Sequence, residues 1–133
     1  MSQFGGAALI LAAALLVSGC GPQIGIVDTQ RVLNESVKAL EYQKQLNDRE
    51  KQMVAELAAL NGQVSPAELT ARRASLTTEL SQLRSDLENQ LNQQLHDAAA
   101  QVARQDGLRL VVIKNSSYLG GRDVTQQVID RLK

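Results

Sequence analysis

One long helical pattern between residues 65 and 107 constrains the fold more than any other feature. Ser65 is a typical helix cap, Pro66 suits the first helical position, and Glu68 completes a capping box. Gly107 is suited to end the helix. The apolar residues between these signals lie three, four or seven positions apart, as on one helix face: Leu69, Leu76, Leu80, Leu83, Leu87, Leu91, Leu95, Ala98 and Val102. A helix of about forty residues would be roughly 60 Å long.

A second helical pattern precedes it, over residues 31–60. Asp28 or Thr29 can cap this helix. Its apolar residues follow a similar period: Leu33, Val37, Leu40, Leu46, Met53, Leu57 and Leu60. Asn61-Gly62 then ends the helix, with Gly62 at the left-handed position. Because the connection to Ser65 is short, the helices should fold back on each other, and residues 31–106 should form an antiparallel helical hairpin.

Short strands are predicted on either side of the hairpin. Residues 23–28 are rich in β-branched side chains on both faces, which predicts a strand buried on both sides. Residues 108–113 give the clearest strand pattern, and Tyr118-Leu119 could add a short one. Asp123 is expected to cap a terminal helix, with Gln126 in the capping-box position. Residues 24–30 and 107–133 would thus form a small β body from which the hairpin projects.

The body is too small to be stable alone. Two or three short strands cannot form an independent sheet, and their open edges can pair with another chain. We therefore expect a mainly α protein that forms oligomers through its β body. The residues assigned to this contact are Ile24, Ile26, Val27, Leu110, Val111, Val112 and Ile113.

The first twenty residues have a different character. An uninterrupted apolar run over residues 7–17 would reach roughly 17 Å as a helix, too short for a bilayer core of about 30 Å. It suits the apolar region of a secretory signal. The sequence Leu16-Val17-Ser18-Gly19-Cys20 resembles a bacterial lipobox. We therefore expect residues 1–19 to be a signal peptide, Cys20 to carry a lipid, and residues 20–23 to be a short linker.

Two alternatives to lipidation stay open: an ordinary signal cleaved beside a free cysteine, and an uncleaved anchor. No Lys or Arg precedes Ala7, although the start of a signal is normally basic. Cys20 is the only cysteine, so an intramolecular disulfide is impossible. Since a lone free thiol is a liability in an oxidising compartment, lipidation is favoured.

Composition argues against several classes of function. The 14 Lys and Arg residues balance 14 Asp and Glu residues, whereas a general nucleic-acid binder needs surplus positive charge. Aromatic residues that could stack on bases or sugars are nearly absent. His96 is the only histidine, and it is interpreted as a solvated helix residue. No nucleotide-binding or nucleophile motif is present. We predict no catalytic site, cofactor, metal or small-molecule substrate.

Three stretches in their order around the hairpin resemble the Skp, or OmpH-like, periplasmic chaperones. Residues 24–28 (IGIVD) are similar to the first strand of that family, and residues 110–113 (LVVI) to the strand after the hairpin. Residues 123–133 (DVTQQVIDRLK) resemble the family's closing helix. With the hairpin, the likeness covers essentially all of residues 24–133.

This resemblance implies a homotrimer whose three hairpins surround a cavity. Members of the family hold unfolded outer-membrane proteins there, without ATP, in the periplasm. For this chain it implies an OmpH-type holdase chaperone with coiled-coil arms that assists outer-membrane protein assembly. Residues suggested for client contact near the tip of the hairpin are Met53, Val54 and Val64.

Two departures from the family keep a second hypothesis open. Residues 31–106 hold 9 Lys or Arg and 11 Asp or Glu, so long-range attraction of acidic clients would be weak. A lipid on Cys20 would also hold the body about 10 Å from a membrane. Gly21, in place of an Asp, favours the outer membrane. The alternative is a structural or adaptor lipoprotein of the envelope that uses its hairpin as a docking rod.

Overall fold

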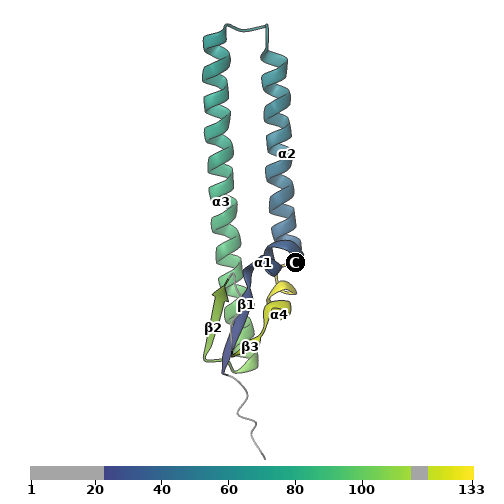
Figure 1. Ribbon diagram of the computed structural model, residues 1–133, viewed down its shortest axis with the longest axis vertical. Helices are drawn as coiled ribbons and strands as arrows, with labels where there is room; N and C mark the ends of the chain where they lie inside the picture. Colours follow the sequence, from purple (N-terminus) through teal and green to yellow (C-terminus); the bar gives the residue numbers. More distant parts are fainter. Residues whose placement is uncertain (1–22, 115–119) are drawn as a thin grey trace, which may run out of the picture.

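The computed structural model describes residues 23–114 and 120–133, and it is an elongated molecule (Figure 1). Two long helices lie side by side, and a small sheet packs at one end of the pair. The elements follow the chain in the order β1 (Ile24–Asp28), α1 (Thr29–Glu35), α2 (Val37–Leu60), α3 (Pro66–Asp106), β2 (Leu110–Lys114), β3 (Arg122–Asp123) and α4 (Thr125–Ile129). The prediction of a mainly α chain with a small β body is confirmed.

The two long helices run in opposite directions (Figure 1). Tyr42 near the start of α2 contacts Gln90 and Gln94 in the second half of α3. Farther from the body, Arg72 of α3 donates through Nε to Glu56 Oε1 of α2 at 2.7 Å. As the residue number increases along α2, the number of the contacting residue in α3 decreases. The helices are therefore antiparallel, as the short connection between them requires.

The ends of α3 follow the local sequence signals. The Ser65 side chain accepts from the Glu68 N–H, and the Glu68 carboxylate accepts from the Ser65 N–H at 2.9 Å. Gly107 adopts the left-handed conformation with φ of 64°, and its N–H donates to the Ala103 carbonyl. Gly62 likewise has a φ of 81° after the end of α2. These boundary predictions are confirmed.

The first helix is not continuous, contrary to prediction. Ser36 is extended, with ψ of 134°, and it separates α1 from α2. Its hydroxyl accepts from the Ala39 N–H at 3.1 Å, while the Leu132 carbonyl accepts from the Lys38 N–H at 3.0 Å. The end of the chain thereby satisfies a backbone donor that the break leaves open.

The break also changes which side of α2 faces its neighbour. Val37 and Leu40, predicted on the packed face, are 49% and 46% exposed. Ala39 and Tyr42 are buried in their place. The prediction was wrong here because a helix that restarts after Ser36 need not keep the phase of the preceding turns. Tyr42 lies four residues before Leu46, a spacing that could have placed it on the packed face.

The sheet has the strand order β2-β1-β3, and both pairings are parallel. Ile24 pairs with Leu110, and Val27 pairs with Ile113. The second predicted strand therefore starts two residues later than expected and extends to Lys114. The very short strand β3 was not predicted. The expected strand at Tyr118-Leu119 lies outside the described residues.

One apolar core joins the sheet to the helices. It combines residues from β1, α1, the last turns of α3, and the C-terminal segment: Val27, Val32, Leu95, Ala98, Ala99, Val102, Val124, Val128, Ile129 and Leu132. The core therefore includes residues of α1 and of the end of α3. The predicted division into a body of residues 24–30 and 107–133 and a hairpin of residues 31–106 stays a prediction, although Val32 and Leu95 of that hairpin pack in the same core as the body.

The start of the terminal helix also differs from the prediction. Asp123 lies in β3, and Val124 occupies the cap position of α4 without a side-chain cap bond. The Asp123 carboxylate does accept from the Thr125 N–H at 2.9 Å, as in a local turn. Gln126 forms no capping box, because its side chain instead contacts Asp130 and Arg31.

Gly25 is a position where a side chain would crowd its neighbours in the core. A Cβ there would lie 2.8 Å from Leu108 Cδ1 and 3.1 Å from Val124 Cγ2. We expect Gly25→Val to lower the free energy of unfolding by about 1–3 kcal/mol, because overpacking forces these neighbours apart. Urea unfolding followed by circular dichroism measures the change. Ile24→Val, at a half-exposed neighbouring position, should change it by less than about 0.5 kcal/mol. Equal effects of the two changes would contradict this account.

Candidate functional site

The outer face of the sheet is an apolar surface that the described chain leaves partly open. Side chains alternate between the two faces of a strand. Ile24 is 45% exposed and Leu110 is 54% exposed, although both are large and apolar. Ile26 and Val112 lie on the same face and are half-buried. We call these four residues the outer sheet face.

The opposite face of the sheet is packed against the chain's own core. Val27 is fully buried, and Val111 and Ile113 pack against the same cluster. The expectation that β1 is buried on both sides is therefore wrong within this chain. Of the seven residues assigned to oligomerisation, these three already have apolar partners. Among the described residues, the outer sheet face is the broad apolar face of the sheet that remains for an oligomer contact.

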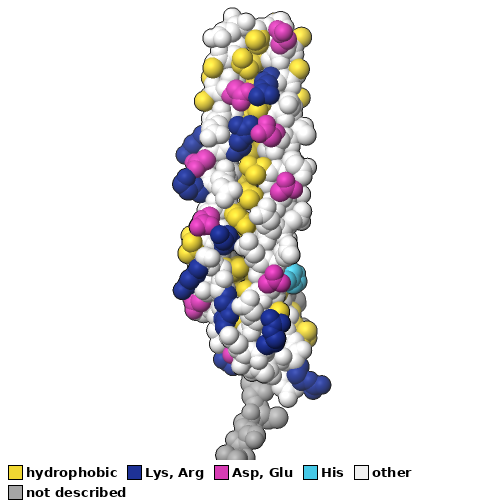
Figure 2. All heavy atoms as spheres, turned by 180° about the vertical axis from the view of Figure 1, so that it is seen from behind, with side chains coloured by type: hydrophobic (Ala, Val, Ile, Leu, Met, Phe, Trp, Pro, Cys, Tyr) yellow, Lys and Arg dark blue, Asp and Glu magenta, His cyan; other side chains and the backbone are white. Residues whose placement is uncertain are grey.

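The helix pair carries an apolar seam with polar residues beside it. Leu76 and Leu87 of α3 are buried against α2, as the stripe predicted. The Tyr42 hydroxyl is also within hydrogen-bond distance of Gln90 at 3.3 Å and accepts from Gln94 at 3.1 Å. Figure 2 shows a strip of hydrophobic side chains along the length of the molecule, bordered by charged ones. Some seam residues are thus buried between α2 and α3, while others are exposed on the surface of the helix pair.

The three residues suggested for client contact lie near the end of the helix pair but differ in exposure. Val54 is 60% exposed on α2. Met53 and Val64 are half-buried, so the helix pair partly covers them. Val54 borders a shallow hollow on α2 together with Ala55 and Ala58. Among the three, Val54 is the one whose side chain is open to a large ligand.

Ion pairs connect the two helices across the seam. Arg49 of α2 contacts Glu79 of α3 at 2.6 Å, and Arg72 of α3 contacts Glu56 of α2. These side chains are partly exposed, so each pair contributes only about 0–1 kcal/mol. Their charges cancel locally. The surface of the helix pair therefore offers mixed charge rather than a field of one sign.

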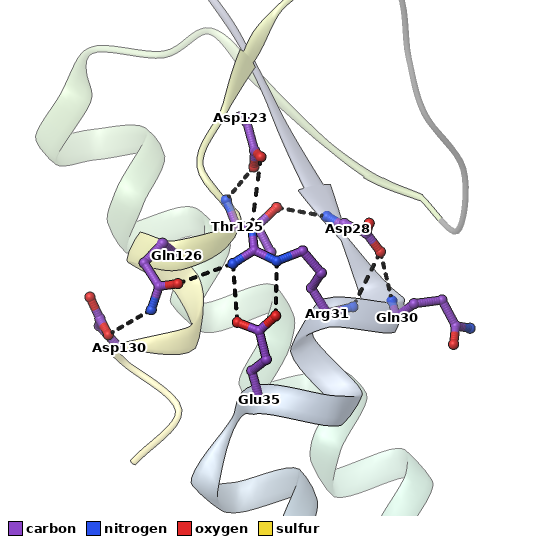
Figure 3. A network of polar contacts seen from close by, with 8 residues as sticks. All are labelled: Asp28, Gln30, Arg31, Glu35, Asp123, Thr125, Gln126 and Asp130. Carbon is purple, nitrogen blue, oxygen red and sulfur yellow. Dashed lines mark hydrogen bonds and ion pairs between the residues drawn. The ribbon is translucent and has the colours of Figure 1, made fainter.

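A polar network connects the two ends of the chain within the body (Figure 3). Arg31 donates to both carboxylate oxygens of Glu35 at 3.0 Å and to Gln126 Oε1 at 3.1 Å. It also lies 3.9 Å from Asp123. The Asp28 N–H donates to Thr125 Oγ1 at 2.9 Å. The contacts with Gln126, Asp123 and Thr125 hold α4 and the segment before it against β1 and α1. Sequence patterns could not have found them because the partners are about a hundred residues apart.

This network should make stability depend on pH at the acid end. The Thr125 hydroxyl and backbone N–H lower the pKa of the Asp123 carboxyl, and Arg31 lowers that of Glu35. A carboxyl with a lowered pKa stabilises the fold above its unfolded value, and this contribution is lost as pH falls through its folded pKa. We expect the free energy of unfolding to fall below about pH 4.

The variant Asp123→Asn isolates part of this effect. Its urea-unfolding free energy should fall less steeply than that of the native chain between about pH 4 and about pH 2. Asp97→Asn serves as the control, because the exposed Asp97 carboxylate has no ion pair or hydrogen bond within the described residues. An unchanged pH dependence in Asp123→Asn would show that this carboxyl does not contribute.

Several predicted features lie beyond the described residues or have no chemical partners within them. The signal peptide, Cys20 and Gly21 fall outside the described ranges. His96 is exposed on α3. No group of three or more acidic, histidine or cysteine residues that could hold a metal occurs within residues 23–114 and 120–133. No helix in those ranges is both long enough and apolar enough to cross a membrane.

Comparison of the chain with protein-family models, with curated proteins and with solved structures found no match. The assignment of a function therefore depends on the residues and geometry described above.

Proposed function

We propose that this chain is a periplasmic, ATP-independent holdase of the Skp-like type, tethered to a membrane through a lipid on Cys20. The observation that carries the proposal is the exposed apolar surface near the end of a long helix pair, at Val54 and the neighbouring Ala55 and Ala58. The order of strand, helix pair, strand and terminal helix around one small body also supports it.

The physical basis of holding is weak and distributed contact. An unfolded outer-membrane protein exposes many apolar segments that aggregate with one another. Mildly apolar arms, at Val54 and along the seam, can cover such segments without specific recognition. The mixed charges of the arms reduce electrostatic steering, so binding should depend only weakly on salt.

Oligomerisation through the outer sheet face would assemble several arms around one client. Ile24 and Leu110 are the most exposed residues of that face. We propose a homotrimer, with three helix pairs enclosing a cavity. Each arm then contributes weak contacts, and their sum holds the client because they are linked in one particle.

The holdase proposal is tested by aggregation of an unfolded porin-type protein diluted from urea. We expect the full-length chain, purified in detergent, to suppress light scattering at a few-fold molar excess. Native mass spectrometry should then show one oligomer with one client chain. Val54→Asp should retain the fold but suppress aggregation less, whereas Val37→Asp, at an exposed site near the body, should behave like the native chain. Failure to suppress scattering would refute the proposal.

Membrane tethering requires its own test. We expect the native chain to sediment with membranes and to carry the mass of a lipid on Cys20, favouring the outer membrane. Cys20→Ala should release the chain into the soluble fraction if it is exported, because the lipid is the proposed anchor. A native chain without lipid mass would contradict the tether while leaving the holdase activity to be judged by aggregation.

A second function, a structural or adaptor lipoprotein, is favoured by a different observation. The seam residues Leu76 and Leu87 are already buried between α2 and α3, and ion pairs fasten the helices to each other. Such a pair is suited to be a docking rod. It predicts one stoichiometric native partner after cross-linking in cells, and no suppression of porin aggregation.

A further inference from the structure

Strand β2 forms an edge of the sheet that no other described strand covers. The order β2-β1-β3 leaves it with one neighbour. In a parallel ladder a residue bonds to the positions before and after its partner. Gly25 pairs with Val111, and the Ile26 carbonyl faces β3, where it accepts from the Val124 N–H. Since the backbone groups of successive strand residues point to opposite sides, Gly25 faces β2 and bonds to the residues on either side of Val111. The N–H and C=O of Val111 and Ile113 are therefore directed to the open edge, and no hydrogen-bond partner among the described residues reaches them.

A groove runs beside this open edge, between β2 and the last turns of α3. It is lined by residues from both elements: His96, Ala99, Ala100, Ala103, Arg109, Leu110, Val111 and Ile113. Leu110 lies on the outer sheet face, whereas Val111 and Ile113 lie on the inner face. Side chains from both faces can line one groove only if it opens at the strand's edge. Because the α3 residues that line the groove include alanines with small side chains, the groove has room for a ligand.

Positive and ionisable groups border the groove. Arg109 precedes β2, and its guanidinium contacts the Gln23 side chain at 3.3 Å. No carboxylate within the described ranges forms an ion pair with Arg109. His96 lies about two helical turns before Ala103, so it borders the other end of the groove. The groove thus has an apolar floor and, at its entrance, a cation that no described carboxylate neutralises.

We propose that this groove binds an extended acidic peptide segment, which adds to β2 as a further strand. Its backbone would bond to the free groups of Val111 and Ile113, as in strand addition by peptide-recognition domains. Alternate small apolar side chains would fill the space over Ala100 and Ala103. An Asp or Glu of the peptide would pair with Arg109.

The charges favour such a peptide over a second copy of the same strand. Arg109 precedes β2, Lys114 is its last residue, and the strand contains no acidic residue. Two copies paired edge to edge would bring cations together without an anion to balance them. The inference does not rest on the holdase function, because that function uses the helix pair and the outer sheet face, which shares only Leu110 with the groove.

A labelled, capped peptide of sequence Asp-Val-Thr-Val-Thr-Val provides the probe, with fluorescence anisotropy as the readout and the full-length chain in detergent. We expect saturable binding. Arg109→Glu should weaken it at least about tenfold, because it replaces a charge-assisted hydrogen bond with repulsion. Ala103→Trp should abolish binding by filling the groove. Arg104→Glu, an equal charge change at an exposed neighbouring site, is the matched control and should leave binding within about twofold.

Amide signals distinguish strand addition from contact with side chains alone. On titration with the peptide, the Val111 and Ile113 N–H resonances should shift and become protected from hydrogen exchange. A peptide with Pro in place of the first Thr should bind at least about tenfold more weakly, because proline lacks the backbone N–H donor. The proposal is overturned if the native chain does not bind, if Ala103→Trp binds equally well, or if these two amides are already protected in the free oligomer. These measurements do not use porin aggregation, so the peptide-binding proposal and the holdase proposal can each fail while the other holds.

Discussion

Val128→Asp is expected to abolish cooperative folding of the body. Val128 is fully buried and packs in the cluster that joins β1, α1, α3 and α4. A carboxylate at this position would have no partner, and an unpaired buried charge costs several kcal/mol, on the order of 3–5 or more. Small domains are stable by only about 5–15 kcal/mol. The thermal transition followed by circular dichroism should be lost or shifted far downward.

The control for this change is Val54→Asp. It replaces the same residue type by the same charge, but Val54 is 60% exposed on α2. We expect its free energy of unfolding to stay within about 0.5 kcal/mol of the native value. A Val128→Asp variant that melts like the native chain would mean that the body core does not hold the fold together.

Signals that act within one turn of the chain predicted the helix boundaries well. The bounds of α3 follow from the Ser65–Glu68 capping box and from Gly107, because each uses contacts between residues a few positions apart. The start of α1 is similar, since Asp28 Oδ1 accepts from the Gln30 N–H at 2.9 Å. Local hydrogen bonds of this kind are present in the sequence pattern itself.

Features that depend on distant partners were missed. The break at Ser36 is completed by the Leu132 carbonyl, almost a hundred residues away. Strand β3 exists because Arg122 and Asp123 lie beside β1, where the Val124 N–H donates to the Ile26 carbonyl at 2.9 Å. A two-residue strand has no periodicity of its own. No pattern in the sequence could therefore distinguish it from a turn.

For the candidate surfaces too, the sequence pattern identified part of the arrangement, and the rest depends on distant contacts. Periodicity identified the apolar residues of β1 and β2 but not which of them face the chain's own core. The sheet register divides them, since Val27 and Ile113 lie together on the inner face and Ile24 and Leu110 on the outer. The groove beside β2 depends on the alanines of α3, whose small side chains look like ordinary helix residues in the sequence.

The outer sheet face leads to the second large expected effect. The double variant Ile24→Lys/Val112→Lys should dissociate the oligomer to monomers at micromolar concentration. Neither residue lines the groove beside β2. Two charges at the centre of an apolar contact should raise the dissociation constant at least about a hundredfold. The monomer itself should stay folded, because long lysine side chains can reach water from a half-exposed face.

Native mass spectrometry or sedimentation measures the outcome, and Val37→Lys/Leu40→Lys is the matched control. Val37 and Leu40 are 49% and 46% exposed, close to the 45% of Ile24, but they lie on α2. If the control dissociates and the sheet variant does not, subunits associate through the helix pair, which would favour a docking rod over arms around a cavity. If only the sheet variant dissociates, the helix pairs are free to enclose a client. If the dissociated sheet variant also no longer suppresses porin aggregation, several arms must act together to hold a client.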